Sequence, residues 1–246
     1  MRIFGLIGKT LTHSFSPTYF KNKFERENIM DAQYKLFSLE NIEEISAIKN
    51  EQENLSGLNV TIPYKESIIP FLDEISEQAK AIGAVNTIAC LPDGRWKGYN
   101  TDAFGFEKAI QTFVDLKTRK ALVLGTGGAS KAVQYILAKH AVPFYLLSRY
   151  PNKDSKEIAY EDLNQNLLES HTLIINCTPL GTFPNINECP NIPFEFIGAK
   201  HFVFDLVYNP RETTLMKKAK AAGAAVANGA LMLENQAEAS WEIWNK

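Results

Sequence analysis

A buried strand that runs directly into a glycine-rich turn is the feature that most constrains this chain. Residues 121–124 are four consecutive apolar residues, and the run Gly125-Thr126-Gly127-Gly128-Ala129-Ser130 follows at once. Apolar residues then recur over 133–140 at the spacing of an amphipathic helix. Small residues let a turn approach a pyrophosphate, and a helix N-terminus offers N–H groups and a positive dipole end. The pattern predicts a dinucleotide site, although ordinary strand–helix units also use such turns.

The residues after the next apolar run indicate which dinucleotide is bound. Residues 144–147 form that run, and it ends at Ser148-Arg149-Tyr150. An NAD site places an acidic residue about 20 positions past the turn, where it binds the ribose 2′-hydroxyl. Arg149 stands there instead, with Lys153 close behind, and a guanidinium suits a 2′-phosphate. The sequence therefore favours NADP over NAD and disfavours S-adenosylmethionine, and a solvated surface arginine is the alternative.

Composition excludes several classes of function. The chain has 246 residues, enough for one large domain or two modest ones, and a formal net charge of −2, which argues against nucleic acid or an anionic membrane as partner. No apolar run approaches the ~20 residues of a membrane span. The three cysteines, Cys90, Cys177 and Cys189, lack metal-type spacing. We therefore expect reduced thiols, no metal and a cytoplasmic location.

Strand-like and helix-like runs alternate along both halves of the chain. In the first half, the expected strands are 2–7, 34–39, 55–62, 85–91 and 95–99, and the expected helices are 17–28, 42–48, 65–72 and 75–82. In the second half, further strands are expected at 172–177, 202–207 and 224–227, and helices at 213–222 and 231–244. The turn Pro92-Asp93-Gly94 predicts one hairpin in a mostly parallel sheet. The fold class is α/β, with a domain boundary near 100–104.

Four short polar runs follow predicted strands, which is where open α/β sheets bind their ligands. They are Thr12-His13-Ser14-Phe15-Ser16-Pro17, Asn59-Val60-Thr61-Ile62-Pro63-Tyr64-Lys65, Gly83-Ala84-Val85-Asn86-Thr87 and Asn100-Thr101-Asp102. The hydroxyls of Ser14 and Ser16 can bind a carboxylate or sugar-like hydroxyls. The alternative for Ser16 is that it caps the helix that follows.

Lys65 and Asp102 are the candidate acid–base pair. Lys65 follows Pro63 at the expected start of a helix, where the helix dipole disfavours a cation and favours proton exchange. A nearby carboxylate would hold the lysine in its charged form, and Asp102 is the carboxylate that we pair with it. A solvated surface lysine remains the alternative.

Together the motifs resemble the shikimate dehydrogenase family. Beside the four polar runs they are the glycine turn, Asn176-Cys177-Thr178-Pro179-Leu180-Gly181, Asp205-Leu206-Val207-Tyr208-Asn209-Pro210, and residues 229–232 with Gln236. They stand in the order of the family and extend from about Gly5 to Gln236, nearly the whole chain. Collinear motifs in this number are far more specific than the glycine turn alone.

The resemblance implies a two-domain enzyme that reduces 3-dehydroshikimate to shikimate with NADPH, in the biosynthesis of chorismate and the aromatic amino acids. Residues 1–100 and the C-terminal helix, 230–246, would form a substrate-binding and catalytic domain with a mostly parallel mixed sheet. Residues 101–229 would form a Rossmann-type NADP-binding domain, and the active site would lie in the cleft between the two. The enzyme would act on a small molecule as a monomer or homodimer, without nucleic acid or membrane.

The resemblance also implies a role for individual residues. Lys65 and Asp102 would be the catalytic pair, with the lysine protonating the substrate oxygen as hydride arrives from the nicotinamide. The substrate would be bound by Ser14, Ser16, Thr61, Lys65, Asn86, Asp102, Tyr208 and Gln236. The cofactor would be bound by Gly125, Thr126, Gly127, Gly128, Ala129, Ser148, Arg149, Lys153, Thr178, Val207 and Gly229.

The chain departs from the family pattern beside the cofactor. Ser148-Arg149-Tyr150 stands where Asn-Arg-Thr is common, and Thr182 stands where methionine is usual. One alternative is therefore a quinate/shikimate dehydrogenase that uses NAD, although the paired serines and the arginine argue against it. The other is a non-catalytic regulator that binds NADP or a metabolite. Such a regulator should lack Lys65 or Asp102, and both are present.

Overall fold

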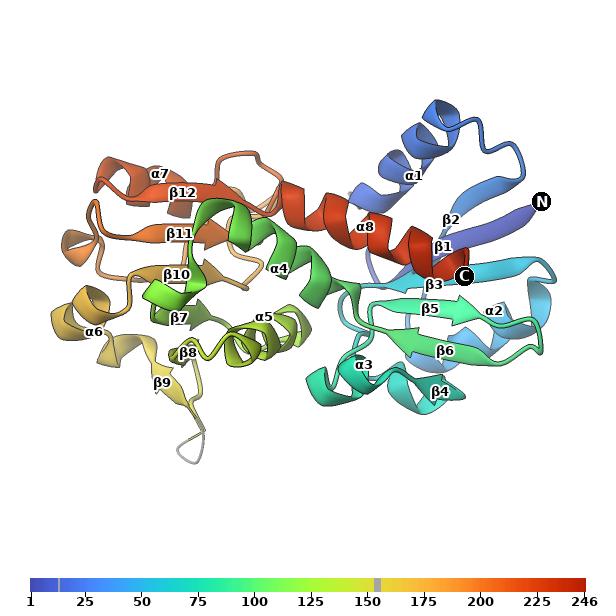
Figure 1. The fold of residues 1–246 in the computed structure, drawn as a ribbon, viewed down its shortest axis with the longest axis horizontal. Helices are drawn as coiled ribbons and strands as arrows, with labels where there is room; N and C mark the ends of the chain where they lie inside the picture. The colour runs from blue at the N-terminus through green and yellow to red at the C-terminus, as the bar shows by residue number, and fades with distance from the viewer. Residues whose placement is uncertain (13, 153–155) are drawn as a thin grey trace. The chain divides into compact units, whose positions relative to one another are not determined.

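The computed structural model describes residues 1–12, 14–152 and 156–246, and these form two compact units (Figure 1). Unit 1 consists of Met1–Gly105 and Leu233–Lys246, and unit 2 consists of Phe106–Met232. Each unit contains its own sheet of strands with helices beside it. The predicted α/β class is confirmed. Within the described ranges, no helix combines the length and the apolar character needed to cross a membrane.

Unit 1 is built on a mixed sheet with the strand order β2-β1-β3-β5-β6-β4. Its strands are β1 (Arg2–Gly8), β2 (Ala32–Ser38), β3 (Leu55–Val60), β4 (Glu74–Ile75), β5 (Thr87–Cys90) and β6 (Trp96–Tyr99). Its helices are α1 (Phe15–Arg26), α2 (Ile45–Glu51) and α3 (Glu77–Ile82), with the short 3-10 helices η1 (Ile42–Glu44) and η2 (Ile69–Phe71). Strand β5 runs antiparallel to β3 and β6, whereas β1 pairs in parallel with β2 and β3. The expected hairpin in a mostly parallel sheet is therefore present.

The expected helix over residues 65–72 is wrong. Residues 62–68 form successive turns, and the 3-10 helix η2 follows them. Pro70 has no N–H to donate to the carbonyl four residues back, so the hydrogen-bond ladder of an α-helix breaks here. Lys65 consequently lies in a turn rather than at a helix N-terminus, so no helix dipole favours its proton exchange.

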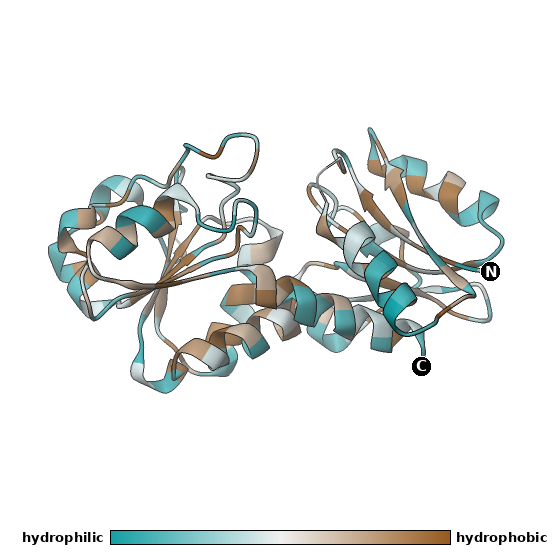
Figure 2. Cartoon of the chain, turned by 90° about the horizontal axis from the view of Figure 1, so that it is seen from above, coloured by the Kyte–Doolittle hydropathy of each residue, from teal (hydrophilic) through white to brown (hydrophobic). Residues whose placement is uncertain are grey.

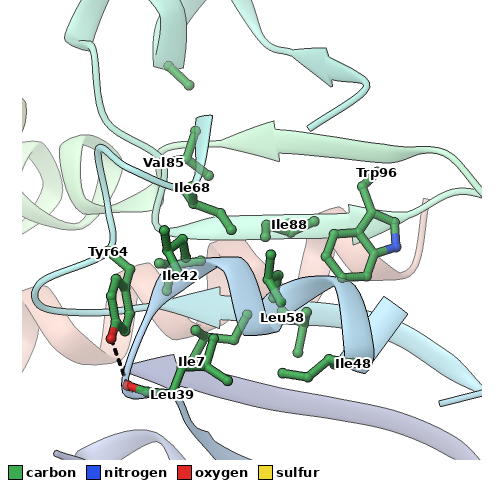
Figure 3. Close-up of a cluster of buried hydrophobic side chains, with 13 residues drawn as sticks. Ile7, Leu39, Ile42, Ile48, Leu58, Tyr64, Ile68, Val85, Ile88 and Trp96 are labelled. Carbon is green, nitrogen blue, oxygen red and sulfur yellow. Dashed lines mark hydrogen bonds between the residues drawn. The ribbon is translucent and has the colours of Figure 1, made fainter. Parts of the chain in front are cut away.

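One face of the unit 1 sheet carries a core of aliphatic side chains (Figure 3). Fully buried members come from β1, β3 and β5 in turn, namely Ile7, Leu58 and Ile88. The ring of Tyr64 also packs into this core, and its hydroxyl donates to the carbonyl of Leu39 at 2.6 Å. Because Tyr64 directly precedes Lys65, the core anchors the turn that carries the candidate catalytic lysine.

The other face of the sheet is covered by α1 and by α8 (Ala230–Trp244), through a cluster of aromatic rings. The ring of Phe4 on β1 stacks on Trp244 with the ring centroids 4.9 Å apart. The Trp244 indole N–H donates to the carbonyl of Ile88 at 2.9 Å. Gly57 lies beneath this indole, and a Cβ there would stand 2.2 Å from the Trp244 ring. The last helix is thus packed tightly on strands from the first hundred residues.

Unit 2 contains a parallel sheet with the strand order β9-β8-β7-β10-β11-β12. Its strands are β7 (Ala121–Leu124), β8 (Phe144–Ser148), β9 (Glu157–Ala159), β10 (Leu173–Asn176), β11 (Phe202–Asp205) and β12 (Ala225–Asn228). Its helices are α5 (Gly128–Lys139), α6 (Gln165–Ser170) and α7 (Thr214–Ala221), with the 3-10 helices η3 (Leu116–Thr118), η4 (Tyr160–Asp162) and η5 (Phe194–Phe196). Helix α4 (Thr101–Phe113) begins in unit 1 and ends in unit 2.

Counted along the chain, the strand order of unit 2 is 3-2-1-4-5-6, the order of dinucleotide-binding folds. The order reverses between β7 and β10, and ligands of such sheets bind at the carboxyl ends of strands at this point. Strand β7 is buried throughout, as its apolar run predicts. Hydrophobic residues concentrate in the strands, whereas hydrophilic and hydrophobic residues are mixed along the helices (Figure 2).

The close approach of Gly57 to Trp244 gives a prediction about stability. We expect Gly57→Ala to lower the free energy of unfolding by about 1–3 kcal/mol, because the added methyl must displace a stacked indole in a packed core. Urea unfolding followed by circular dichroism measures the change. Gly198→Ala is the control, since a Cβ there would have the Ala222 carbonyl oxygen as its nearest neighbour at 3.9 Å. Equal unfolding midpoints for the two variants would contradict the prediction.

Candidate active site

Lys65 and Asp102 form a close, shielded ion pair in unit 1. The Lys65 Nζ lies 2.6 Å from the Asp102 Oδ2, so the contact expected from the sequence is present. Only 16% of the lysine side chain and 7% of the aspartate side chain are exposed, so water screens their attraction weakly. An ammonium carries three N–H donors. Lys65 can therefore hold Asp102 and still donate to an acceptor on a ligand.

One short segment of chain holds both members of the pair. The Val85 N–H donates to the carbonyl of Lys65 at 2.7 Å. The Asn100 side chain donates to the carbonyl of Ala84 at 2.9 Å, and its oxygen accepts from the N–H of Ala103 in the first turn of α4. The start of the helix that carries Asp102 and the turn that carries Lys65 are thus tied to adjacent residues, which fixes the spacing of the two side chains.

Two carboxamides, from Asn86 and Gln236, meet in the same unit. The Asn86 Oδ1 accepts from the Thr101 N–H at 2.7 Å, and the Asn86 Nδ2 donates to the Gln236 Oε1 at 3.2 Å. Asn86 precedes β5, Thr101 begins α4, and Gln236 lies on α8. Thr101 is the immediate neighbour of Asp102. The backbone bond from Thr101 therefore links this amide pair to the ion pair.

The amide pair belongs to a larger buried network. The Asn59 Nδ2, at the end of β3, donates to the Ser240 Oγ at 3.0 Å and to the Thr87 Oγ1 at 3.2 Å. The Asn59 Oδ1 accepts from the Tyr34 hydroxyl at 2.8 Å. Ser16 hydrogen-bonds the same phenol, whose pKa is raised by burial, so the phenol remains neutral. Among the described residues, every buried side-chain nitrogen and oxygen has a partner.

Three aliphatic hydroxyls proposed for the substrate lie in the first two polar runs. Ser14 is the N-cap residue of α1, but its side chain makes no capping hydrogen bond. Ser16 lies inside the helix and is buried, so the capping role considered for it is wrong. Thr61 directly follows β3, and its N–H donates to the Ile7 carbonyl at 2.8 Å. His13 lies outside the described residues.

In unit 2, the glycine turn joins β7 to α5. Gly125 has a φ of +99°, a left-handed conformation that favours glycine, and a Cβ there would lie 3.0 Å from the Thr178 methyl carbon. Gly127 is the N-cap residue of α5 and supplies no side-chain cap. Beyond its two chain neighbours, a Cβ at Gly127 would meet none of the described residues within 4 Å. Packing within the chain therefore does not explain glycine at this position, and the space beside it is open to a ligand.

The carboxyl ends of β10 and β11 are joined by the carboxylate of Asp205. The Asp205 Oδ1 accepts from the Asn176 Nδ2 at 2.8 Å and from the Val207 N–H at 3.1 Å, and its Oδ2 accepts from the Thr213 hydroxyl at 2.6 Å. The Asn176 Oδ1 in turn accepts from the Thr178 N–H and hydroxyl. Asp205 thereby orders the loops that carry Thr178 and Val207, two proposed cofactor residues.

The end of β8 presents the residues proposed for the ribose phosphate. The Ser148 Oγ accepts from the Tyr150 N–H at 3.2 Å, and the side chains of Arg149 and Tyr150 are exposed. Burial raises the pKa of nearby Tyr160 to about 12, and the positive charge of Arg149 opposes this rise. Lys153 lies outside the described residues.

Comparison with known proteins decides the family. Residues 6–88 match the family model described as the shikimate dehydrogenase substrate binding domain. A shikimate dehydrogenase (NADP(+)) from Methanosphaera stadtmanae is 37% identical over 98% of this chain and 90% of that protein. The chain belongs to the shikimate dehydrogenase family.

Solved structures of shikimate dehydrogenases share the fold. Shikimate dehydrogenase 1 from Peptoclostridium difficile superimposes with a TM-score of 0.88 at 38% identity, covering 100% of this chain and 92% of that chain. Shikimate 5-dehydrogenase from Thermus thermophilus, solved with NADP(H) and shikimate, gives a TM-score of 0.87 at 29% identity and covers 99% of this chain and 93% of that chain. These likenesses confirm the two-domain α/β fold expected of the family.

In this family member the proposed residues are divided between the two units. Unit 1 contains Ser14, Ser16, Thr61, Lys65, Asn86, Asp102 and Gln236. Unit 2 contains Tyr208 and the described cofactor residues Gly125, Thr126, Gly127, Gly128, Ala129, Ser148, Arg149, Thr178, Val207 and Gly229. Tyr208 follows β11, and the Gly229 N–H donates to the Val207 carbonyl at 3.3 Å.

Two residues that hold others in place are absent from the predicted site. Ser240 and Asp205 were not singled out as individual site residues, although each makes several buried hydrogen bonds. For Ser240 a signal exists, because it stands four positions after Gln236 and so shares its helix face. For Asp205 the only signal is its place at the end of a strand, in a motif that the family resemblance already contained.

The environment of Asp205 gives a prediction about pH. Burial raises the pKa of this carboxyl above its ordinary value, although the hydrogen bonds from Thr213, Val207 and Asn176 lower it. The folded state thus holds this proton more tightly than the unfolded state does, so the contribution of Asp205 to stability is lost as pH rises from about 4 through the raised pKa. We expect Asp205→Asn to gain stability relative to the parent protein over this range, measured by urea unfolding at several pH values.

Asp73→Asn is the matched control with the opposite sign. Hydrogen bonds from the Trp96 N–H and Lys49 lower the pKa of Asp73, so its contribution is present above the ordinary carboxyl pKa and is lost as pH falls. This variant should lose stability relative to the parent protein as pH rises. If the free energy of unfolding of Asp205→Asn instead changes with pH in parallel with that of the parent protein, the raised pKa assigned to Asp205 is wrong.

Proposed function

We propose that this protein is an oxidoreductase that catalyses the reversible, NADPH-dependent reduction of 3-dehydroshikimate to shikimate, a step toward chorismate and the aromatic amino acids. The observation that carries the proposal is the shielded Lys65–Asp102 pair, 2.6 Å apart, linked through Thr101 to the amides of Asn86 and Gln236. The proposal is also supported by the 37% identity, over nearly the full length of this chain, with a shikimate dehydrogenase (NADP(+)).

The polar groups of unit 1 suit a hydroxylated carboxylic acid. We assign the substrate carboxylate to the hydroxyls of Ser14 and Ser16 at the start of α1, where the helix N-terminus also favours an anion. We assign the ring hydroxyls to Thr61, Asn86, Asp102 and Gln236. An analogue that lacks one of these hydroxyls would leave a buried polar group unpaired, which is how such a site rejects it.

In this proposal Lys65 transfers the proton and Asp102 orients Lys65. Reduction of the ketone requires a proton on the oxygen while a hydride reaches the carbonyl carbon, and bound NADPH supplies that hydride. The Lys65 ammonium donates its proton to the forming hydroxyl, and in the reverse direction the neutral amine accepts it. Asp102 orients the ammonium through the 2.6 Å contact and stabilises its charge.

The residues of unit 2 fit NADP. The open space beside Gly127 leaves room for a pyrophosphate at the first turn of α5, where free N–H groups point toward an anion. Arg149, exposed at the end of β8, offers a planar fork of donors to a 2′-phosphate. Ser148, Thr178, Val207 and Gly229 complete the proposed contacts around the turn.

The thiols support a reducing compartment. All three cysteines are free, and burial raises the pKa of Cys90 to about 12 and that of Cys177 further, so both are protonated and unreactive at neutral pH. We propose that the enzyme works in the cytoplasm as a monomer or homodimer on a small-molecule substrate.

Steady-state assays that cross shikimate and quinate against NADP and NAD test the function. We expect turnover with shikimate and NADP, followed by nicotinamide absorbance. Comparable turnover with quinate or with NAD would assign the protein to the dual-specificity relatives. A folded protein that binds NADP but is inactive in all four assays would be a regulator, and the proposal would fail.

Lys65→Ala tests the acid–base role. We expect kcat to fall by roughly 10²–10⁴-fold while the KM for shikimate changes little, because the proton donor is lost and the hydroxyl contacts remain. Lys9→Ala is the control, since Lys9 forms an exposed pair with Glu40 on the surface of the same unit. Near-normal turnover of Lys65→Ala would exclude the lysine as the proton donor.

Arg149→Ala tests the choice of cofactor. We expect the KM for NADP to rise by about 10- to 100-fold and the KM for NAD to change far less, because the charged bonds to the 2′-phosphate are removed. Arg149→Lys keeps the charge but loses the planar fork of donors. Its KM for NADP should therefore lie between those of the parent protein and of Arg149→Ala. An equal loss for both cofactors would make the arginine structural.

A further inference from the structure

Ser240 is a buried hydroxyl at the junction of four structural elements. It lies on α8, one turn after Gln236, and is 0% exposed. Its Oγ is 3.0 Å from the Asn59 Nδ2 at the end of β3, 2.9 Å from the Thr87 Oγ1 of β5 and 3.1 Å from the Thr101 Oγ1 of α4. It is also 2.9 Å from the Gln236 carbonyl oxygen.

Hydrogen-bond chemistry assigns most of these contacts a direction. A hydroxyl has one donor and two acceptor sites. The Gln236 carbonyl can only accept and the Asn59 amino group can only donate. The Ser240 hydroxyl thus donates within its own helix and accepts from Asn59 and from one of the two threonines. All its capacity is used by protein groups, so it has no role as a direct ligand of a substrate.

Through its partners, Ser240 acts on both proposed substrate amides. The Asn86 Oδ1 accepts from the Thr87 hydroxyl at 3.1 Å and from the Thr101 N–H at 2.7 Å. These two bonds orient the Asn86 amide so that its Nδ2 donates to the Gln236 Oε1. The Gln236 oxygen is thereby occupied, and its amino group is the part that can donate to a ligand.

We propose that Ser240 is a positioning residue for substrate recognition, which holds the amides of Asn86 and Gln236 in the orientation that binds the ring hydroxyls. The inference rests on the proposed function, because it takes those amides as substrate contacts. Loss of the Ser240 Oγ removes the acceptor that the Asn59 amino group shares with one threonine hydroxyl, and the Asn59 Nδ2 then keeps only the Thr87 Oγ1 at 3.2 Å and the Asn86 carbonyl at 3.4 Å. The amides then occupy several orientations, and substrate binding has to select one of them.

Steady-state kinetics of Ser240→Ala with shikimate and NADP test the proposal. We expect the KM for shikimate to rise by about fivefold to tenfold, with the KM for NADP unchanged and kcat affected less. Ser170→Ala is the matched control, because the Ser170 hydroxyl also donates to the carbonyl four residues back, at 2.8 Å, but on the exposed helix α6. An unchanged KM for shikimate in Ser240→Ala would overturn the proposal.

A double-mutant cycle with Gln236→Ala separates positioning from a general loss of stability. If Ser240 acts through the Gln236 amide, Ser240→Ala should raise the KM for shikimate by no more than about twofold once that amide is gone. An equal rise in both backgrounds would overturn the action of Ser240 through the Gln236 amide. Ser240→Thr keeps the hydroxyl and should restore most of the affinity for shikimate. If the alanine variant does not fold, Ser240→Cys replaces it, because cysteine is close in size to serine but hydrogen-bonds weakly. The KM for shikimate should rise in this variant as well.

The parent protein distinguishes failure of this proposal from failure of the proposed function. Turnover of shikimate by the parent protein, with an unaltered KM in Ser240→Ala, overturns only the role of Ser240. A parent protein that does not turn over shikimate overturns both, because the amides would then have no such substrate to recognise.

Discussion

The packing of α8 against the unit 1 sheet is the constraint on which the site depends. Three residues one turn apart on this helix, Gln236, Ser240 and Trp244, contact consecutive residues of the chain at Asn86, Thr87 and Ile88. Trp244 is held by an aromatic cluster and by a hydrogen bond to a strand carbonyl, so the helix cannot slide. The apolar end of the helix thereby sets the register that brings its polar end to the amide of Asn86.

Two buried aspartates show how partners decide what a carboxylate can do. Asp102 faces the Lys65 ammonium, a charge that can gain and lose a proton, and the pair is suited to chemistry. Asp205 faces two neutral side chains and a backbone N–H, and burial raises its pKa. With no cation among these contacts, Asp205 ties two loops together but offers no route for a proton. Asp205 ends β11 and Asp102 lies in the first turn of α4, just after β6, so the two residues differ chiefly in their partners.

Much of the fold could be predicted from the sequence, because long periodic runs and the glycine turn are local signals. Strands β7, β10 and β11 and helices α5 and α8 lie within a few residues of their expected places. The short elements β9 and α6 were not expected, since three to six residues carry little periodicity. The helix predicted at 65–72 failed because the spacing of apolar residues was read without the effect of Pro70.

The site was predictable only where the signal was local. A pattern of polar runs at strand ends indicated Lys65, Asn86 and Asp102, but no spacing indicates that Ser240 lies against Asn59, which is 181 residues away. The same holds for what positions Lys65. The prediction expected a helix dipole to favour proton exchange at Lys65, whereas in the structure Lys65 lies in a turn whose backbone is held by the Tyr64 ring in the core and by the Val85 N–H. Such contacts are tertiary, so the expected contact between Lys65 and Asp102 is present, but the helix start expected at Lys65 is not. A lysine held by neighbouring backbone and oriented by a carboxylate keeps its position whether it is protonated or neutral, which a reversible proton transfer requires.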